Sequence, residues 1–241
     1  MLHFEERNSD NCGQEERQRM TEFLRDTFVT DGNHNYPAEG LQVARGDQKI
    51  AFEFGPSVAV VRVSQGAYTT FAASILPEVY KLRRFVYDVL GLPRVRRIDV
   101  RKISVFPIMI EGEPPTEENV GEHLSMVLSD NVLSLMTMDH IPGPDGTVGS
   151  FTRSMMEDRE TGLRYTILTG LVKDQERENI YNVILDATCF YMPANGIAQI
   201  GLEEMLTKMN QNVYELYHWA VRDHVIEFMD RDLSDAGQQG V

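Results

Sequence analysis

Residues 180–192 place an unbroken row of apolar or aromatic side chains at every second position. The apolar set on one side is Tyr181, Val183, Leu185, Ala187, Cys189 and Tyr191. Asn182, Asp186 and Thr188 fall on the other side. Successive side chains of a strand point to opposite faces, so this period of two predicts a strand with one buried face.

Three further strand-like runs precede this one, and turn-forming residues separate them. The four runs lie near 131–141, 148–157, 163–172 and 180–192. Runs at this spacing favour an antiparallel meander. After them, apolar residues at helical spacing predict a long C-terminal helix over about 202–229 that covers the sheet. Its apolar stripe is Leu202, Leu206, Met209, Val213, Leu216 and Ala220.

The first half of the chain combines helices with a β-hairpin. A helix is expected over 14–29, and strands over 50–54 and 58–63 form the hairpin. A second helix opens at Ser74, has Pro77 in its first turn, and ends at Gly91, where a left-handed cap is expected.

The strand that follows, about 95–108, changes the side on which its apolar residues lie. Ile98 and Val100 share one face, whereas Ile103 and Val105 share the other. Two explanations stay open: a β-bulge, or a long strand that serves two packing surfaces.

These elements predict an α+β protein in two packed halves, with antiparallel or mixed sheets each covered by helix. The acidic, proline-paired segment 111–118 is the expected joint. We therefore expect an N-terminal α+β half over 1–118 and a β-meander with the C-terminal helix over 119–241, packed as one unit of 241 residues.

Positive charge is concentrated near the middle of a strongly acidic chain. The formal net charge is −14, which disfavours general nucleic-acid binding. Residues 75–110 nevertheless hold eight basic and three acidic residues, a local charge of +5. The basic residues are Lys81, Arg83, Arg84, Arg94, Arg96, Arg97, Arg101 and Lys102.

Three interpretations of this basic cluster stay open. The first and favoured one is an internal network of arginines with acidic neighbours. The second is a site for an anion or an acidic partner, and the third is self-association of the basic patch with the acidic remainder. Under the last two, the binding residues are Arg97, Arg101, Arg83 and Arg84.

The sequence contains no motif that predicts catalysis or a cofactor. Glycine-rich phosphate loops and the common hydrolase and zinc motifs are missing. Glu215 and His218 have the spacing of half a di-iron motif, but no second copy exists, so no metal site is predicted. Cys189 lies on the apolar side of its strand and is expected to be a buried, inert thiol. We expect no catalytic residues, and the enzyme question stays open with a leaning towards none.

Other features bear on location and on binding. No apolar run is long enough for a membrane span, the first residues do not form a secretory signal, and two cysteines suit a reducing cytoplasm. The twelve methionines, Met126, Met155 and Met156 among them, serve either as core filler or as the lining of an adaptable apolar groove.

The order of motifs resembles that of a protein family. A Tyr36-Pro37 step, a hairpin, an aromatic-led helix, and the run from Gly91 to Arg101 come in sequence before Asp186 and the C-terminal helix. In this the chain resembles a sporadically distributed prokaryotic family of uncharacterised proteins of similar length. The resemblance implies one integrated fold and brings no reaction, cofactor or catalytic residue. Of that family's arginine–aromatic–aliphatic–Asn-Arg run, only Arg101 and an aliphatic residue match here.

The leading functional hypothesis is a non-enzymatic binding or assembly protein, homodimeric and acting through protein–protein contacts. A chaperone-like, peptide-holding role is a variant of it. The alternative is an enzyme or sensor of an anionic small molecule, with Arg97 and Arg101 as clamps.

Overall fold

The computed structural model describes the chain in segments. They are residues 1–3, 18, 22–23, 34–35, 41–44, 50–54, 58–64, 69–89, 91, 94–116, 118–135, 140–142, 148–198 and 201–227. The fold is α+β with an antiparallel sheet and a long C-terminal helix, as predicted. No helix within these segments is long and apolar enough to cross a membrane.

The chain divides into two compact units, and each combines segments that are distant in sequence. Unit 1 contains Met1–Val100 and Phe190–Asn210, and unit 2 contains Arg101–Cys189 and Gln211–Val241. The chain therefore passes between units three times, whereas the two halves expected from the sequence are joined only once, near residue 118.

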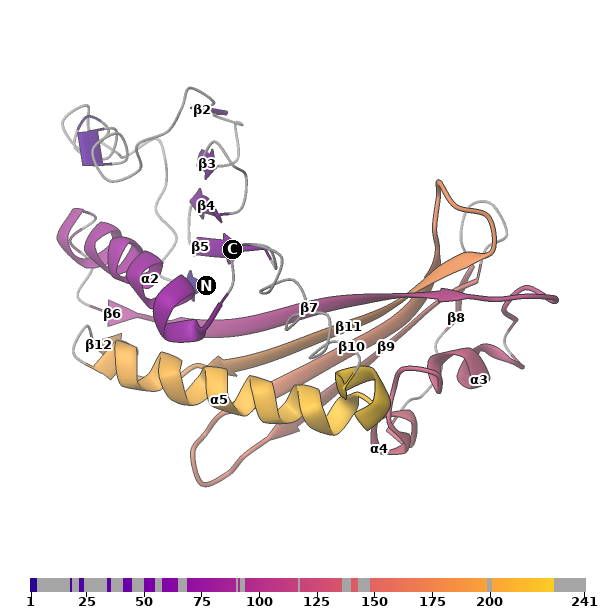
Figure 1. Cartoon of the computed structure of the whole chain (residues 1–241). Coiled ribbons are helices and arrows are strands. Elements are labelled where there is room, and N and C mark those ends of the chain that lie inside the picture. Colours follow the sequence, from indigo (N-terminus) through magenta and orange to yellow (C-terminus); the bar gives the residue numbers. More distant parts are fainter. Residues whose placement is uncertain are drawn as a thin grey trace. The chain divides into compact units, whose positions relative to one another are not determined.

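Unit 1 contains a set of short antiparallel strands (Figure 1). Its sheet runs in the order β2-β3-β4-β5-β1-β7, and β12 pairs with β6. Their bounds are β1 Leu2–His3, β2 His34–Asn35, β3 Leu41–Ala44, β4 Ile50–Phe54, β5 Val58–Val63, β6 Arg94–Val95, β7 Arg97–Met109 and β12 Ile197–Ala198. The predicted hairpin is confirmed, since β4 and β5 pair from Ile50 opposite Val63 to Phe54 opposite Ala59.

The predicted middle helix is also present, but it begins earlier than Ser74. Its three consecutive parts are η3 Phe71–Ile75, α2 Leu76–Arg83 and η4 Arg84–Val89, the outer two being π-helical. Thr70 caps it by accepting a hydrogen bond from the Ala73 N–H (3.1 Å), while Ser74 is buried within the first turn. Gly91 has the left-handed backbone expected of a cap (φ 64°). The expected helix over 14–29 lies outside the described residues, except for helical positions 18, 22 and 23.

Unit 2 contains the predicted meander. Its strands run in the order β7-β11-β10-β9-β8, with β8 His140–Pro142, β9 Val148–Glu157, β10 Arg164–Lys173 and β11 Ile180–Tyr191. The strand expected over 131–141 is wrong in its first part, because Asp130–Leu133 forms the short helix α4. Ser129, which has an extended backbone, precedes α4, and the Ser129 carbonyl accepts a hydrogen bond from the Leu133 N–H (3.1 Å). The backbone here therefore forms helical hydrogen bonds in place of the strand-to-strand hydrogen bonds expected. Residues 136–139 lie outside the described part.

Helices cover one face of the unit 2 sheet. They are α3 Val120–Leu124, α4 and the last residues of α5 Leu202–Ala220 (Figure 1). The core of the unit lies between them and the strands. Its buried members are Phe106, Ile110, Val120, Leu124, Val127, Leu128, Val132, Ile167, Leu171, Tyr181, Val183, Leu185, Tyr217, Ala220 and Val221.

The C-terminal helix α5 ends at Ala220, so the predicted end near residue 229 is wrong. Val221 forms a bridge with Leu128 instead of continuing the helix, and the Arg222 N–H donates to the Val127 carbonyl (2.9 Å). Residues 223–227 make one more helical turn. The backbone thus leaves the helix where a buried valine joins the core.

Candidate functional site

Arg97 of β7, a predicted binding residue in unit 1, is paired with a carboxylate of its own strand. Its guanidinium donates two hydrogen bonds to Asp99 (2.6 and 3.1 Å) and lies over the Phe190 ring, 4.2 Å from the centroid. His3 also contacts the buried Asp99 carboxylate, at 2.8 Å. Burial would raise the pKa of Asp99, but the hydrogen bonds from His3 and Arg97 outweigh it and hold that pKa below its usual value.

Arg101, also on β7 but in unit 2, makes a similar pair with another strand. Its Nε donates to Asp186 Oδ1 of β11 (2.8 Å), and its second nitrogen donates to Oδ2 of the same carboxylate. Asp186 is buried, whereas the Arg101 side chain is 42% exposed. This fork-to-carboxylate geometry is the one in which arginine binds most strongly.

Arg83 and Arg84 lie in unit 1, at the end of α2 and the start of η4. Arg83 lies over the Tyr80 ring (5.6 Å) and Arg84 over the Phe23 ring (5.5 Å). The Arg83 Nε is buried and has no hydrogen-bond partner within the described residues.

Of the four arginines predicted to bind a partner, three lie in unit 1 and one, Arg101, lies in unit 2. Each contacts a carboxylate or an aromatic ring of its own unit, as the internal-network interpretation expects. Binding of an anion or of a partner through them stays a hypothesis.

The strand β7 has a regular alternation of buried and exposed side chains in unit 2. Lys102 and Phe106 point to the helix-covered face, where Lys102 lies 3.6 Å from the Tyr217 ring centroid and Phe106 stacks on the same ring. Ile103, Val105 and Met109 point the other way and are 55%, 54% and 63% exposed. Because the alternation is unbroken from Val100 to Met109, the change of apolar side is explained by two surfaces rather than by a bulge.

We call the helix-covered side of the unit 2 sheet the inner face and the opposite side the outer face. In β9, Met155 points to the outer face and is 69% exposed. Its register partner Thr166 and the next outer-face residue of β10, Leu168, are half-buried. On β11, Ile184 shares the outer face with Asp186 and is also half-buried. The outer face therefore carries apolar residues on each of four adjacent strands, with polar and charged residues between them.

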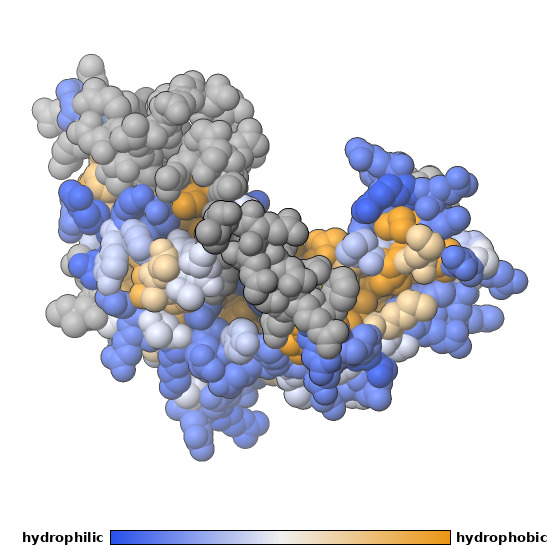
Figure 2. Space-filling model, viewed as in Figure 1, coloured by the Kyte–Doolittle hydropathy of each residue, from blue (hydrophilic) through white to orange (hydrophobic). Residues whose placement is uncertain are grey.

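Within unit 2, no described helix covers the outer face. Figure 2 shows hydrophobic residues (orange) exposed at the surface on the right of the molecule. The face of an antiparallel sheet that meets water normally carries polar residues. Contiguous exposed apolar residues mark interaction sites.

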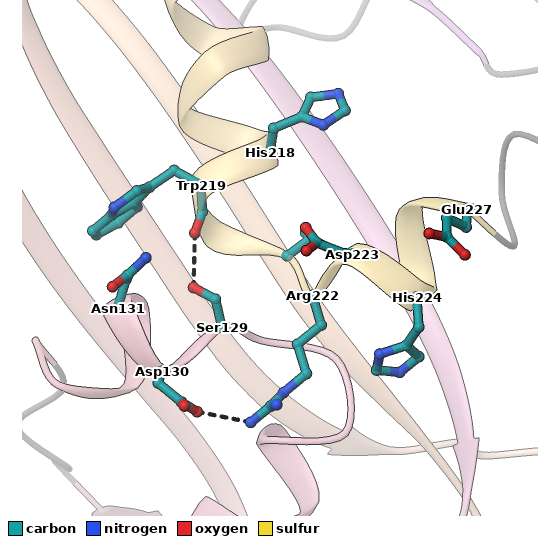
Figure 3. A pocket seen from close by; sticks show the side chains of 10 residues that line it. Ser129, Asp130, Asn131, His218, Trp219, Arg222, Asp223, His224 and Glu227 are labelled. Atoms are coloured by element: carbon teal, nitrogen blue, oxygen red, sulfur yellow. Dashed lines mark hydrogen bonds and ion pairs between the residues drawn. The ribbon is translucent and has the colours of Figure 1, made fainter.

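A polar hollow of about 670 Å³ lies at the end of α5 in unit 2 (Figure 3). Arg222 donates to Asp130 Oδ1 (2.7 Å), and the Ser129 hydroxyl donates to the Trp219 carbonyl (2.7 Å). The side chains of His218 and His224 extend away from Ser129 (Figure 3). Ser129 carries the only side-chain hydroxyl among the residues that line the hollow, and this hydroxyl donates to the Trp219 carbonyl. Neither of the two lining histidines hydrogen-bonds to the Ser129 hydroxyl as a general base would.

Other side chains that could react or bind a metal lie within the fold. Cys189 is buried, as expected, and the described residues contain no group of three or more His, Cys, Asp or Glu arranged to hold a metal. Burial raises the pKa of Tyr165, whose hydroxyl accepts a hydrogen bond from Asn212 (2.7 Å). The hydrogen bond from Arg177 lowers the pKa of Asp174, which caps the turn before β11.

Neither the outer face nor the hollow was identified from the sequence as a site. The outer face did leave a signal in the sequence, namely the change of apolar side at Ile103 and the place of Met155 among the methionines that could line an apolar groove. The hollow left none, because Ser129 and Trp219 meet across 90 residues of chain.

Comparison of the chain with family models, with curated proteins and with solved structures gives no match.

Proposed function

We propose that this chain is a non-enzymatic binding protein that acts through protein–protein contacts, and that the outer face of unit 2 makes them. The observation that carries the proposal is that Ile103, Val105, Met109 and Met155 are each more than half exposed on one continuous face. If this face met only water, polar residues would be expected there, since exposed apolar residues favour aggregation.

Covering the outer face releases enough free energy to support binding. Complete burial of one large apolar side chain is worth about 1.5–3 kcal/mol. About half of the area of each of these four side chains is still exposed, so covering it would contribute roughly 1 kcal/mol for each. The total of about 4 kcal/mol is a useful part of the binding energy of a weak or moderate complex.

A chaperone-like role is a variant of the proposal, supported by the chemistry of the face. Methionine is flexible and polarizable and adapts to irregular apolar partners. Met109 and Met155 lie on the outer face, whereas Met156 packs against the core on the inner face. The two roles predicted for methionines are thus divided between the two faces of one sheet.

The alternative function, an enzyme or sensor of an anionic small molecule, relies on the arginine forks. Those of Arg97 and Arg101 are each engaged by a carboxylate. An anion would have to displace Asp99 or Asp186, and both of these are buried. Thermal-shift measurements with nucleotides and phosphorylated metabolites test this alternative: stabilisation that disappears in Arg101→Ala supports it.

The proposal includes a cytoplasmic setting and a protein partner or a second copy, without general affinity for nucleic acid. The net charge of −14 repels a phosphate backbone. A chain with only two cysteines in 241 residues suits a reducing compartment.

Paired substitutions test the proposal. A denatured, fluorescently labelled polypeptide is titrated into the wild-type chain, Val105→Lys and Met155→Lys, and its anisotropy is measured. We expect each lysine on the outer face to weaken binding at least about fivefold, which corresponds to about 1 kcal/mol. Met126→Lys is the matched control, because Met126 is exposed to a similar extent (48%) in the turn after α3. Equal binding by all four proteins refutes the role of the outer face.

A further inference from the structure

We infer that the partner which covers the outer face is a second copy of this chain, with the two outer faces packed against each other about a twofold axis. The inference rests on the proposed function and names its partner. Three features of unit 2 carry it: a guarded strand edge, a face of nearly zero charge, and a face of suitable size.

Beyond Asp99, no strand among the described residues pairs with β7 on its β1 side, and we call this the open edge. The open edge is guarded against strand addition, so the face rather than the edge is available. The neighbours of β7 are β1 and β11, and of the β7 residues β1 pairs with Arg97 and Ile98. The Asp99 N–H donates towards β1, and the Ile110 N–H donates to the Asn179 carbonyl before β11. Odd-numbered residues of β7 therefore direct their backbone groups to the open edge.

Pro107 is one of these odd-numbered residues, and it has no N–H to offer. Proline on an open edge interrupts the ladder that an added strand needs, and native sheets use it to prevent edge pairing. The edge is thus closed to extended pairing in its middle, while the face beside it stays apolar.

The charge of the outer face fits a second copy of an acidic chain. Its charged residues on the four strands are three basic and two acidic, a net charge of +1. They are Arg101, Arg153, Arg164, Asp186 and Glu157. Arg101 pairs with Asp186, and Arg164 pairs with Glu157 (3.0 Å).

Charge opposes contact between the acidic parts of two copies. The whole chain carries −14, so outside the basic cluster of residues 75–110 such a contact brings like charges together. On the outer face four of the five charges pair within each copy, and Arg153 remains as a net charge of +1. Two such faces meet with one positive charge on each copy, far less than the −14 of the whole chain.

The size of the face matches a small, reversible dimer. Four strands spaced about 4.8 Å apart give a width of roughly 19 Å, and eight residues per strand give a length of roughly 27 Å. The flat area is about 500 Å² per copy, somewhat below the 800 Å² or so that a standard interface buries on each partner. Two sheets packed face to face at about 10 Å bring these apolar side chains into contact.

Sedimentation velocity of the full chain over roughly 1–100 μM tests the inference in the range expected for a small interface. We expect the wild-type chain to shift reversibly from monomer to dimer. Ile103→Lys and Met155→Lys are expected to raise the dimer dissociation constant at least about tenfold, while Met126→Lys leaves it unchanged. Val105→Thr, which keeps shape and strand propensity, gives a smaller rise and serves where a lysine variant fails to fold.

Salt separates this dimer from one held by the basic cluster. Raising sodium chloride from about 0.05 to about 0.5 M leaves an apolar, charge-compensated interface intact or strengthens it. A dimer that dissociates in salt, or that persists in Ile103→Lys and Met155→Lys, overturns the inference.

A wild-type chain that stays monomeric up to 100 μM or so also overturns the second copy as the partner. In that case the polypeptide titration decides the fate of the proposed function separately. Binding that Val105→Lys and Met155→Lys weaken keeps the proposed function and removes only the dimer. Binding unaffected by both removes the two together.

Discussion

The two faces of the unit 2 sheet use the same kinds of residue for different ends. On β7, Phe106 of the inner face is 8% exposed and stacks on Tyr217, whereas its neighbour Val105 on the outer face is 54% exposed. The inner face acquires its partner from the chain itself, because α3, α4 and α5 supply the opposing apolar side chains. The outer face acquires none from the described part of the chain.

The comparison teaches that apolar content alone does not define a core. A buried apolar residue contributes to stability in proportion to the area it removes from water. The exposed apolar residues of the outer face, such as Ile103 and Val105, have removed little area from water, so they contribute little to folding and remain available for association. Stability and association are therefore expected to respond to different substitutions in one strand or its neighbour.

The largest expected effect is on the inner face. Leu171→Ala removes a completely buried side chain from the unit 2 core, and we expect it to lower the free energy of unfolding by about 2–5 kcal/mol. Ile103→Ala on the outer face is expected to change it by less than about 1 kcal/mol. Urea unfolding followed by circular dichroism measures both. Similar losses at the two positions contradict the division between the faces.

A smaller effect is expected from the ion pair on the outer face. Arg101→Ala leaves the buried Asp186 carboxylate without its two guanidinium bonds, so we expect a loss of about 1.5–3 kcal/mol. The double variant Arg101→Ala/Asp186→Ala removes both partners and is expected to lose less than the two single losses added together. Strictly additive losses in the same urea measurement mean that the pair does not couple.

Much of the fold could be predicted from the sequence because local patterns specify it. The alternation around Leu185 identifies β11, and the hairpin from Ile50 to Val63 is likewise local. Where tertiary contacts decide, prediction failed. The helical pattern continues past Ala220, but the bridge from Val221 to Leu128 ends the helix there.

The candidate site was harder to predict for a physical reason. Pattern reasoning identifies which residues share a face, and it grouped Ile103 with Val105 correctly. It does not reveal whether that face is covered, because the cover comes from residues distant in sequence. The arginines drew attention as a run of like charge, yet Asp186 lies 85 positions from Arg101. Only the folded chain shows that this carboxylate accepts the guanidinium bonds.

In unit 1, the ion pair of Asp99 with Arg97 is expected to stabilise the fold in a way that depends on pH. The lowered pKa of Asp99 means that its ionised form stabilises the fold above pH about 4, and that this contribution disappears as pH falls through the folded-state pKa. Asp99→Asn keeps the shape but loses the charge, so we expect it to cost about 1 kcal/mol at pH 7. The difference from wild type should shrink towards pH 3 or so in urea unfolding. A constant difference across this range contradicts the assignment.

The smallest expected effect belongs to the exposed ion pair between Arg164 and Glu157. Both side chains are at least 40% exposed, and water screens such pairs, so Arg164→Ala is expected to change the free energy of unfolding by no more than about 0.5 kcal/mol. The same variant should leave the dimer almost unchanged, because apolar contact and not charge holds the outer faces together. Glu157→Ala is the matched control from the other side of the pair. If either variant loses association strongly while its free energy of unfolding is unchanged, charge and not apolar contact holds the interface together. The outer face would then not serve as an apolar docking surface.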